Sequence, residues 1–71
     1  MADSTPLATV IFAMENGDFL ATLWHSKDRP PIWIVRGSGK VWYLPPGGDP
    51  SESATAVRQR FTTYLESLEQ S

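Results

Sequence analysis

The chain has no cysteine and a single histidine, His25. Without cysteine it can hold neither a disulfide nor a zinc site built on thiolates, so a metal site would depend on carboxylates and carbonyls alone. No cofactor and no metal ion are expected. The chain has 71 residues, which is near the lower size limit for a single hydrophobic core. Because disulfides and metal sites are the usual supports of such small domains, self-association is the most economical support left.

The chain also lacks long apolar segments. The longest, Leu7 to Met14, is interrupted by Thr9 and is far too short to span a bilayer. The first residues have neither the basic region nor the apolar core of a secretory signal. We therefore expect a cytoplasmic protein without membrane contact, with residues 1–6 as a flexible N-terminal arm and residues 7–71 as a single domain.

A basic excess is absent as well. The formal net charge is −2, which disfavours a general nucleic-acid binder. The basic residues are unevenly placed, however, because Lys27, Arg29, Arg36 and Lys40 lie close together in the sequence. This grouping predicts a local basic rim on an acidic protein.

What the sequence does contain is a regular succession of short apolar segments separated by turn residues. Two pairs of segments flank turn signals, so each pair predicts a β-hairpin. The first turn is Asn16-Gly17, a strong hairpin signal, and the second is Gly37-Ser38-Gly39. The four predicted strands are 7–14, 19–25, 31–36 and 40–44.

A helix is predicted after the strands. Pro45-Pro46-Gly47-Gly48 ends the sheet, and Asp49, Pro50 and Glu52 supply an N-cap, a first-turn proline and an acidic third position. The apolar residues that follow recur every three or four positions, which predicts one buried face of a helix from about Pro50 to about Leu68. They are Ala54, Val57, Phe61, Tyr64, Leu65 and Leu68. The predicted fold is α+β: a four-stranded antiparallel meander of two β-hairpins, followed by one C-terminal amphipathic helix on one sheet face.

The predicted strand pairing divides the side chains between two faces. Met14 lies opposite Phe19, Ile34 lies opposite Trp42, and Leu23 lies beside Ile34. The helix then covers a core face that holds Ala8, Val10, Phe12, Met14, Phe19, Ala21, Leu23, Ile32, Ile34, Trp42 and Leu44. The other face is apolar as well and holds Ile11, Leu20, Trp24, Trp33, Val35, Val41 and Tyr43.

Three tryptophans, Trp24, Trp33 and Trp42, recur at the spacing of one strand and one turn. In the predicted register, Trp24, Trp33 and Tyr43 form an aromatic row across the second face. A one-residue change in the connection between the hairpins would reverse the second hairpin, and would expose Trp42 instead of Trp33 and Tyr43.

An apolar outer face on an antiparallel sheet predicts an interaction site, because such a face is normally polar. The predicted partner-binding residues are Leu20, Trp24, Trp33, Val35 and Tyr43, with Arg29, Arg36 and Lys40 as a polar rim. We expect a small non-enzymatic interaction module, a regulator, inhibitor or adaptor, that forms a homodimer or binds another protein. Two alternatives stay open. In the first, single-stranded nucleic acid would stack on the same aromatic residues beside the basic rim. In the second, a strongly curled sheet, or the Pro-rich loop and the N-terminal arm, would bury the row.

Two short motifs suggest catalysis, and each lacks a required part. Gly37-Ser38-Gly39-Lys40 resembles the end of a phosphate-binding loop, but it has no upstream glycine partner and precedes a strand. His25, Ser26 and Asp28 are too close along the chain to converge as a hydrolytic triad. No catalytic residue is therefore predicted.

The segment from Leu44 to Gln59 is similar to the start of a Nudix box. That family binds Mg²⁺ through an Arg-Glu pair followed by a Glu-Glu pair on a helix. Arg58-Gln59 and Thr62-Thr63 stand at these places and lack the carboxylates. The sequence therefore predicts no metal ligand here, and an enzyme is the least favoured class.

Overall fold

The computed structural model describes residues 5–25, 27–44 and 47–70. They form β1 (Ala8–Met14), β2 (Gly17–Trp24), β3 (Ile32–Gly37), β4 (Lys40–Leu44) and α1 (Ala54–Gln70). The strands lie in the order β1-β2-β3-β4, and each runs antiparallel to its neighbours. The predicted α+β fold, a meander followed by one C-terminal helix, is confirmed. Most of the predicted N-terminal arm (1–6) and residues 45–46 lie outside the described residues.

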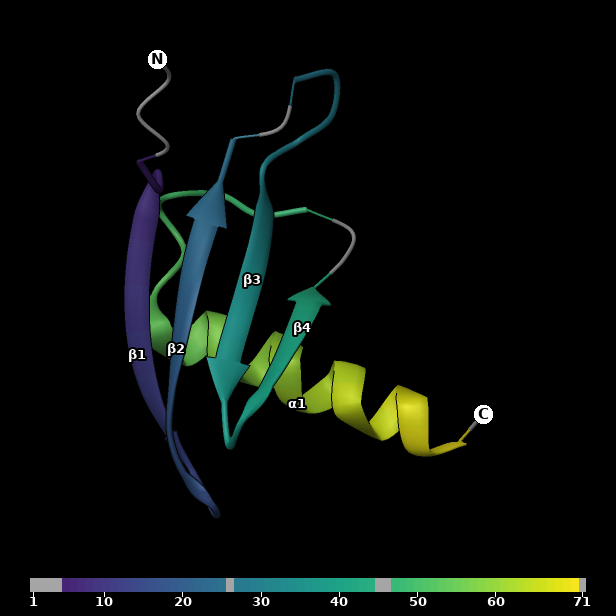
Figure 1. Ribbon diagram of the computed structural model, residues 1–71. Coiled ribbons are helices and arrows are strands. Elements are labelled where there is room, and N and C mark those ends of the chain that lie inside the picture. The colour runs from purple at the N-terminus through teal and green to yellow at the C-terminus, as the bar shows by residue number, and fades with distance from the viewer. Residues whose placement is uncertain (1–4, 26, 45–46, 71) are drawn as a thin grey trace.

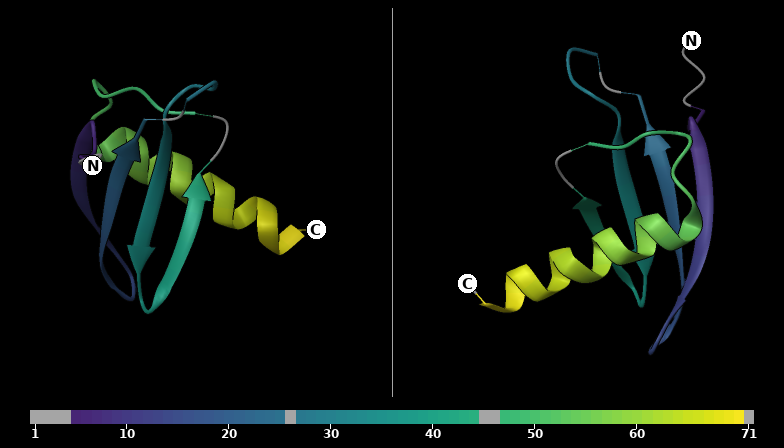
Figure 2. Two further views of the ribbon diagram at one scale, coloured as in Figure 1. Left: turned by 45° about the horizontal axis from the view of Figure 1, so that its top comes forward. Right: turned by 180° about the vertical axis from the view of Figure 1, so that it is seen from behind.

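The sheet and the helix form two layers (Figure 1). α1 crosses one side of the sheet diagonally, with its N-terminus beside β1 and its C-terminal end beyond β4 (Figures 1 and 2). The segment that leads into α1 crosses the same side of the sheet near the top (Figure 2). No described helix or strand lies on the opposite side, so only one sheet face is covered.

β1 and β2 are joined by a tight turn at Glu15–Asn16, so that Met14 pairs with Gly17. The predicted turn one residue later, with Met14 opposite Phe19, is wrong by two positions. In the observed register Phe12 lies opposite Phe19, and the two rings stack with their centroids 6.2 Å apart. Contact between two large rings favours this register. Because the shift is even, the predicted faces of both strands are unchanged.

β3 and β4 are joined by a two-residue turn, Ser38–Gly39, and not by the three predicted residues. The φ angles of these residues are 55° and 75°, and a type I′ turn requires positive values at both positions. Val35 consequently lies opposite Trp42, where the prediction placed Ile34.

β3 is also shifted by one residue against β2, because Leu23 lies opposite Trp33 and not beside Ile34 as predicted. The two one-residue differences together reverse the faces of β3 and leave those of β2 and β4 unchanged. Trp33 and Val35, predicted for the uncovered side, are each 0% exposed and belong to the core. Ile32 and Ile34, predicted for the core, take their places on the uncovered side. The predicted row of Trp33 with other aromatic residues is therefore wrong, because a side-chain period of two makes any odd shift exchange the faces.

The core lies between the sheet and α1. Among the described residues, those buried in it are Phe12, Phe19, Ala21, Leu23, Trp33, Val35, Leu44, Val57 and Phe61. Trp42 packs against this core as predicted, with its ring centroid 5.0 Å from that of Phe61. The Phe61 ring also contacts the Phe12 and Phe19 rings, at 5.9 and 5.6 Å. Aromatic pairs at such separations stabilise by about 0.5–1.5 kcal/mol each beyond area burial, so Phe61 is the main anchor of α1.

α1 begins at Ala54, later than the predicted start at Pro50. Ser53 is its N-cap, because the hydroxyl accepts a hydrogen bond of 3.1 Å from the backbone N–H three residues later. Asp49 and Glu52 form a separate turn, in which the Glu52 N–H donates to the Asp49 carbonyl at 3.0 Å. The predicted capping residues therefore shape the entry to the helix rather than its first turn.

The reversal of β3 is tested by one substitution at two positions. Val35→Thr places a hydroxyl in the core, and a buried hydroxyl without a partner costs about 1–3 kcal/mol. Val41 is 52% exposed on the uncovered side, so Val41→Thr, the matched control, should change the free energy of unfolding by less than about 0.5 kcal/mol. Urea denaturation followed by circular dichroism measures both variants. Equal small costs would contradict the observed register.

Candidate functional site

The uncovered side of the sheet is apolar. Four of its large side chains are exposed: Ile11 (64%), Leu20 (38%), Val41 (52%) and Tyr43 (60%). Trp24, Ile32 and Ile34 are half-buried on the same side. We call this set the open face; its residues are Ile11, Leu20, Trp24, Ile32, Ile34, Val41 and Tyr43. Contiguous apolar exposure of this kind marks interaction sites on soluble domains.

The register arranges most of the open face in two rows across the sheet. One row is Ile11, Leu20, Arg36 and Val41, and the next is Thr9, Thr22, Ile34 and Tyr43. Arg36 is the one charged residue in these rows. It is exposed and makes no ion pair with any residue that the structure describes. A cation among apolar side chains favours a partner surface with a carboxylate at the matching position.

Trp24 lies at one end of the open face. Its indole N–H donates a hydrogen bond of 2.8 Å to the Thr22 hydroxyl, and that hydroxyl lies 3.5 Å from the Ile34 carbonyl oxygen. These contacts satisfy the single polar atom of the indole within the chain. The ring is thus held against the sheet and adds apolar area to the open face.

The structure brings together only part of the predicted apolar site. Leu20, Trp24 and Tyr43 lie on the open face as predicted. Trp33 and Val35 lie in the core, so their predicted placement is wrong. The sequence from residue 32 to residue 35 is apolar at every position, so alternation alone does not distinguish the two faces of β3. The lengths of the connection before β3 and of the turn after it are the signals that distinguish them.

The predicted basic rim is only partly assembled. Arg36 lies within the open face, whereas Lys40 starts β4 and shares its side with Trp42, by the alternation of side chains along the strand. Arg29 is exposed in the connection between β2 and β3. A single cation, rather than a row of cations, therefore accompanies the apolar residues.

On the covered side, Glu52 links three parts of the chain. Its Oε2 atom accepts hydrogen bonds from Trp33 Nε1 at 2.9 Å and from the Asp49 N–H at 2.8 Å. Arg60 Nη1 donates to both carboxylate oxygens, at 2.8 and 3.0 Å, and Arg60 Nη2 donates to the Gly47 carbonyl. The carboxylate therefore joins β3, the segment before α1 and α1 itself.

A hollow of ≈ 330 Å³ lies beside this junction. It is lined by Pro30, Gly47, Gly48, Asp49 and Glu52. A Cβ atom on Gly48 would lie 2.4 Å from Trp33 Cδ1 and 2.5 Å from Leu23 Cδ1, so only glycine allows the backbone this close to the indole. The polar atoms beside the hollow are engaged in holding Trp33 in place, which is a structural role.

The same contacts determine the charge of the two acids. Partial burial by itself raises the pKa of the Glu52 carboxyl, but the hydrogen bonds from Trp33, Arg60 and the Asp49 N–H, with the charge of Arg60, outweigh it and lower that pKa. Hydrogen bonds from the Ser51 hydroxyl and N–H lower the pKa of Asp49. Neither carboxyl is poised to exchange a proton near neutral pH.

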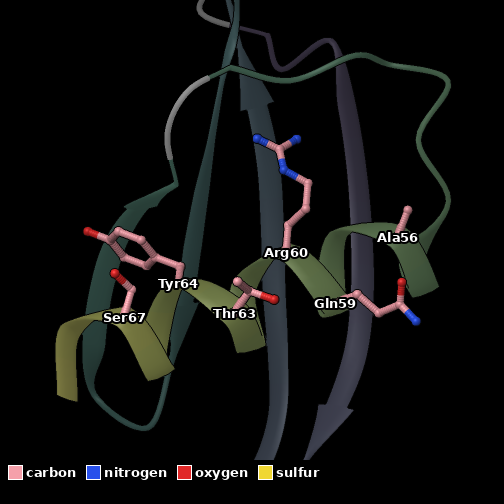
Figure 3. A pocket seen from close by; sticks show the side chains of 6 residues that line it. All are labelled: Ala56, Gln59, Arg60, Thr63, Tyr64 and Ser67. Carbon is pink, nitrogen blue, oxygen red and sulfur yellow. The ribbon is translucent and has the colours of Figure 1, made fainter. Parts of the chain in front are cut away.

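A groove runs along one side of α1 (Figure 3). Its volume is ≈ 530 Å³, and it is lined by Ala56, Gln59, Arg60, Thr63, Tyr64 and Ser67. These positions recur every three or four residues, so they form one strip along the helix, beside the buried stripe. Small side chains at Ala56, Thr63 and Ser67 leave the floor of the strip open to close approach by another chain.

No family model, curated protein or solved structure matches this chain. Within residues 5–25, 27–44 and 47–70, no helix is both long enough and apolar enough to cross a membrane. In that same part of the chain, no three histidine, aspartate or glutamate side chains gather where they could hold a metal ion. The function is therefore inferred from the geometry of the open face.

The Glu52 junction predicts a loss of stability in acid. Because the pKa of Glu52 is lowered in the folded state, the unfolded chain takes up the proton first as the pH falls. The free energy of unfolding should thus be constant above the ordinary pKa of 4.5 and decrease below it. Glu52→Gln should cost about 1–2 kcal/mol at pH 7 and should flatten the acid dependence. Denaturant titrations at several pH values measure both effects. An equally steep decline in the variant would rule out this role of Glu52.

Proposed function

We propose that this chain is a non-enzymatic protein-interaction module that binds a partner protein through the open face. The observation that carries the proposal is the exposure of Ile11, Val41 and Tyr43, each more than half exposed on a sheet side that no described helix or strand covers. A monomeric domain gains nothing in its own stability from such residues. Their burial against a partner is favourable at about 25 cal/mol per Å² of apolar area.

The chemistry of the face supports a protein partner with mixed character. Apolar side chains surround Arg36, so the complementary surface is apolar with a carboxylate opposite the guanidinium. Tyr43 and Trp24 provide the aromatic anchors that commonly dominate interface energetics. The charge pair would select the orientation of the partner, and the aromatic and aliphatic contacts would supply most of the affinity.

The dimensions of the face favour a modest interface. Four strands span about 14 Å, and the exposed part of the strands extends for about 20 Å. Their product, about 280 Å², is well below the area of about 800 Å² that each partner buries in a stable complex, so one open face gives a small interface. Contacts of this size are typical of transient regulatory binding, which fits a regulator, inhibitor or adaptor.

Single-stranded nucleic acid is the second candidate ligand. Trp24 and Tyr43 are the two aromatic residues on the open face, and Arg36 is the cation among them. Stacking platforms combine such groups with a basic groove. The basic groove is the weaker part here, because Lys40 lies on the other side of the sheet and the net charge is −2.

The partner-binding role is tested by photo-crosslinking. Tyr43 is replaced by a photoreactive phenylalanine analogue, and the control places the same analogue at Thr55, which is exposed on α1. Position 43 should crosslink to a discrete partner protein in extracts of the source cell, and this product should differ in mass from a covalent dimer of the chain. Adding Ile11→Asp, which puts a charge in the open face, should weaken that crosslink about tenfold or more and leave the unfolding transition in place. Identical products from positions 43 and 55 would contradict the proposal.

The nucleic-acid alternative predicts a different signal. Oligo(dT) added at low salt should quench the tryptophan fluorescence if bases stack on Trp24, and Arg36→Gln should weaken the binding and reduce its salt dependence. We expect no quenching, because a single cation on the face does not supply the backbone contacts. Saturable, salt-dependent quenching would overturn the protein-partner proposal in favour of this one.

A further inference from the structure

The helix is longer than the sheet it covers. Its 17 residues extend for about 25 Å, whereas β1 and β4 lie about 14 Å apart in a sheet of this size. The C-terminal end of α1 therefore passes the edge of β4, as both views show (Figures 1 and 2).

The apolar stripe of α1 continues onto this overhanging end. Val57 and Phe61 are fully buried under the sheet, Leu65 is half-buried, and Leu68 is 48% exposed. All four belong to the same stripe, so exposure rises as the helix leaves the sheet. This gradient predicts that an apolar surface, such as an additional strand beyond β4, covers Leu68 in the assembled protein.

The edge of β4 is able to supply that continuation by pairing. β4 is the last strand in the sheet order, and its outer backbone groups pair with no other described strand. In a hairpin with a two-residue turn, hydrogen-bonded pairs alternate along the ladder, which directs the N–H and C=O groups of Val41 and Tyr43 outward. These two residues offer a short ladder to another antiparallel strand.

We propose that a second copy of this chain occupies this edge, with β4 of each copy paired antiparallel about a two-fold axis. The sheet then continues beneath the overhanging helix end, and Leu68 of each copy packs on the sheet of the other. The same rotation places the two helices side by side and antiparallel, and it brings the overhanging end of each helix to the groove of the other (Figure 3). One two-fold rotation therefore covers both the exposed end of the apolar stripe and the groove along α1.

The side chains of the groove agree with this packing. Ala56, Thr63 and Ser67 are small enough for two helices to approach closely. The guanidinium of Arg60, in the same groove, already pairs with Glu52, so the fit of the two helices rests on shape rather than on charge.

The dimer also enlarges the open face. Pairing at β4 sets Val41 and Tyr43 of one copy beside the same residues of the other, so two open faces become one continuous apolar surface. The dimer uses the backbone edge of β4 and the groove, whereas the partner-binding role uses the side chains of the open face. Of these, Ile11 and Leu20 lie on β1 and β2, away from the β4 edge. The two proposals can therefore fail independently, because Ile11→Asp should weaken partner binding and leave the dimer intact.

Hydrodynamic mass tests the assembly. Sedimentation equilibrium at micromolar concentration should give twice the chain mass of 7.9 kDa. Leu68→Ser should weaken dimerisation about tenfold or more. The control is Leu7→Ser, since Leu7 is 45% exposed and lies before β1, away from the β4 edge. A strict monomer, or equal weakening by both variants, would overturn the proposal.

Single cysteines give a second test that does not depend on small changes in stability. The chain has no cysteine of its own, so a disulfide in a single-cysteine variant joins two copies. Ser67→Cys in the groove should oxidise rapidly to a covalent dimer, because the groove lies close to the two-fold axis. Thr55→Cys, exposed on another side of α1, should oxidise about tenfold or more slowly. Similar rates at both positions would contradict the proposed axis.

Discussion

The structure depends on the burial of the Trp33 indole. A large ring in the centre of the sheet must be covered, and its N–H must find an acceptor, because a buried polar atom without one is costly. Glu52 provides that acceptor, and Arg60 neutralises the carboxylate that does so. Gly48 lets the backbone close over the ring. One side chain on β3 therefore determines where the connecting segment runs, where α1 begins and which side of the sheet the helix covers.

The sequence predicts the order of the elements well, because turn residues and apolar periodicity are local signals. It predicts the faces of β1 and β2 despite a shifted register, since the shift is even. It does not predict the faces of β3, where Ile32, Trp33, Ile34 and Val35 are all apolar. There the choice belongs to the geometry of the Ser38–Gly39 turn and to the long-range contact between Trp33 and Glu52. Two of the five predicted apolar site residues, Trp33 and Val35, moved to the core with that choice.

The two sides of the sheet are under different constraints. On the covered side, Phe61, Val57 and their neighbours are tied together by dense packing, so a change of one group affects several contacts. On the open side, Ile11, Val41 and Tyr43 contribute little to folding because they are solvated in the single chain. The residues of the open face are therefore free to change in sequence while the core stays fixed. The same division runs along α1. Its first turns pack on the sheet, and its last turns are the part that we propose contacts a second copy.

The three tryptophans lie in three different environments. Trp33 is fully buried with its N–H on a carboxylate, Trp42 is half-buried among phenylalanine rings, and Trp24 is half-buried on the open side with its N–H on a threonine. Intrinsic fluorescence of this protein is consequently a composite of spatially separated probes. Only Trp24 lies on the open side, so a change in its share of the emission reports on the open face. The native chain thus carries its own sensor for what happens there.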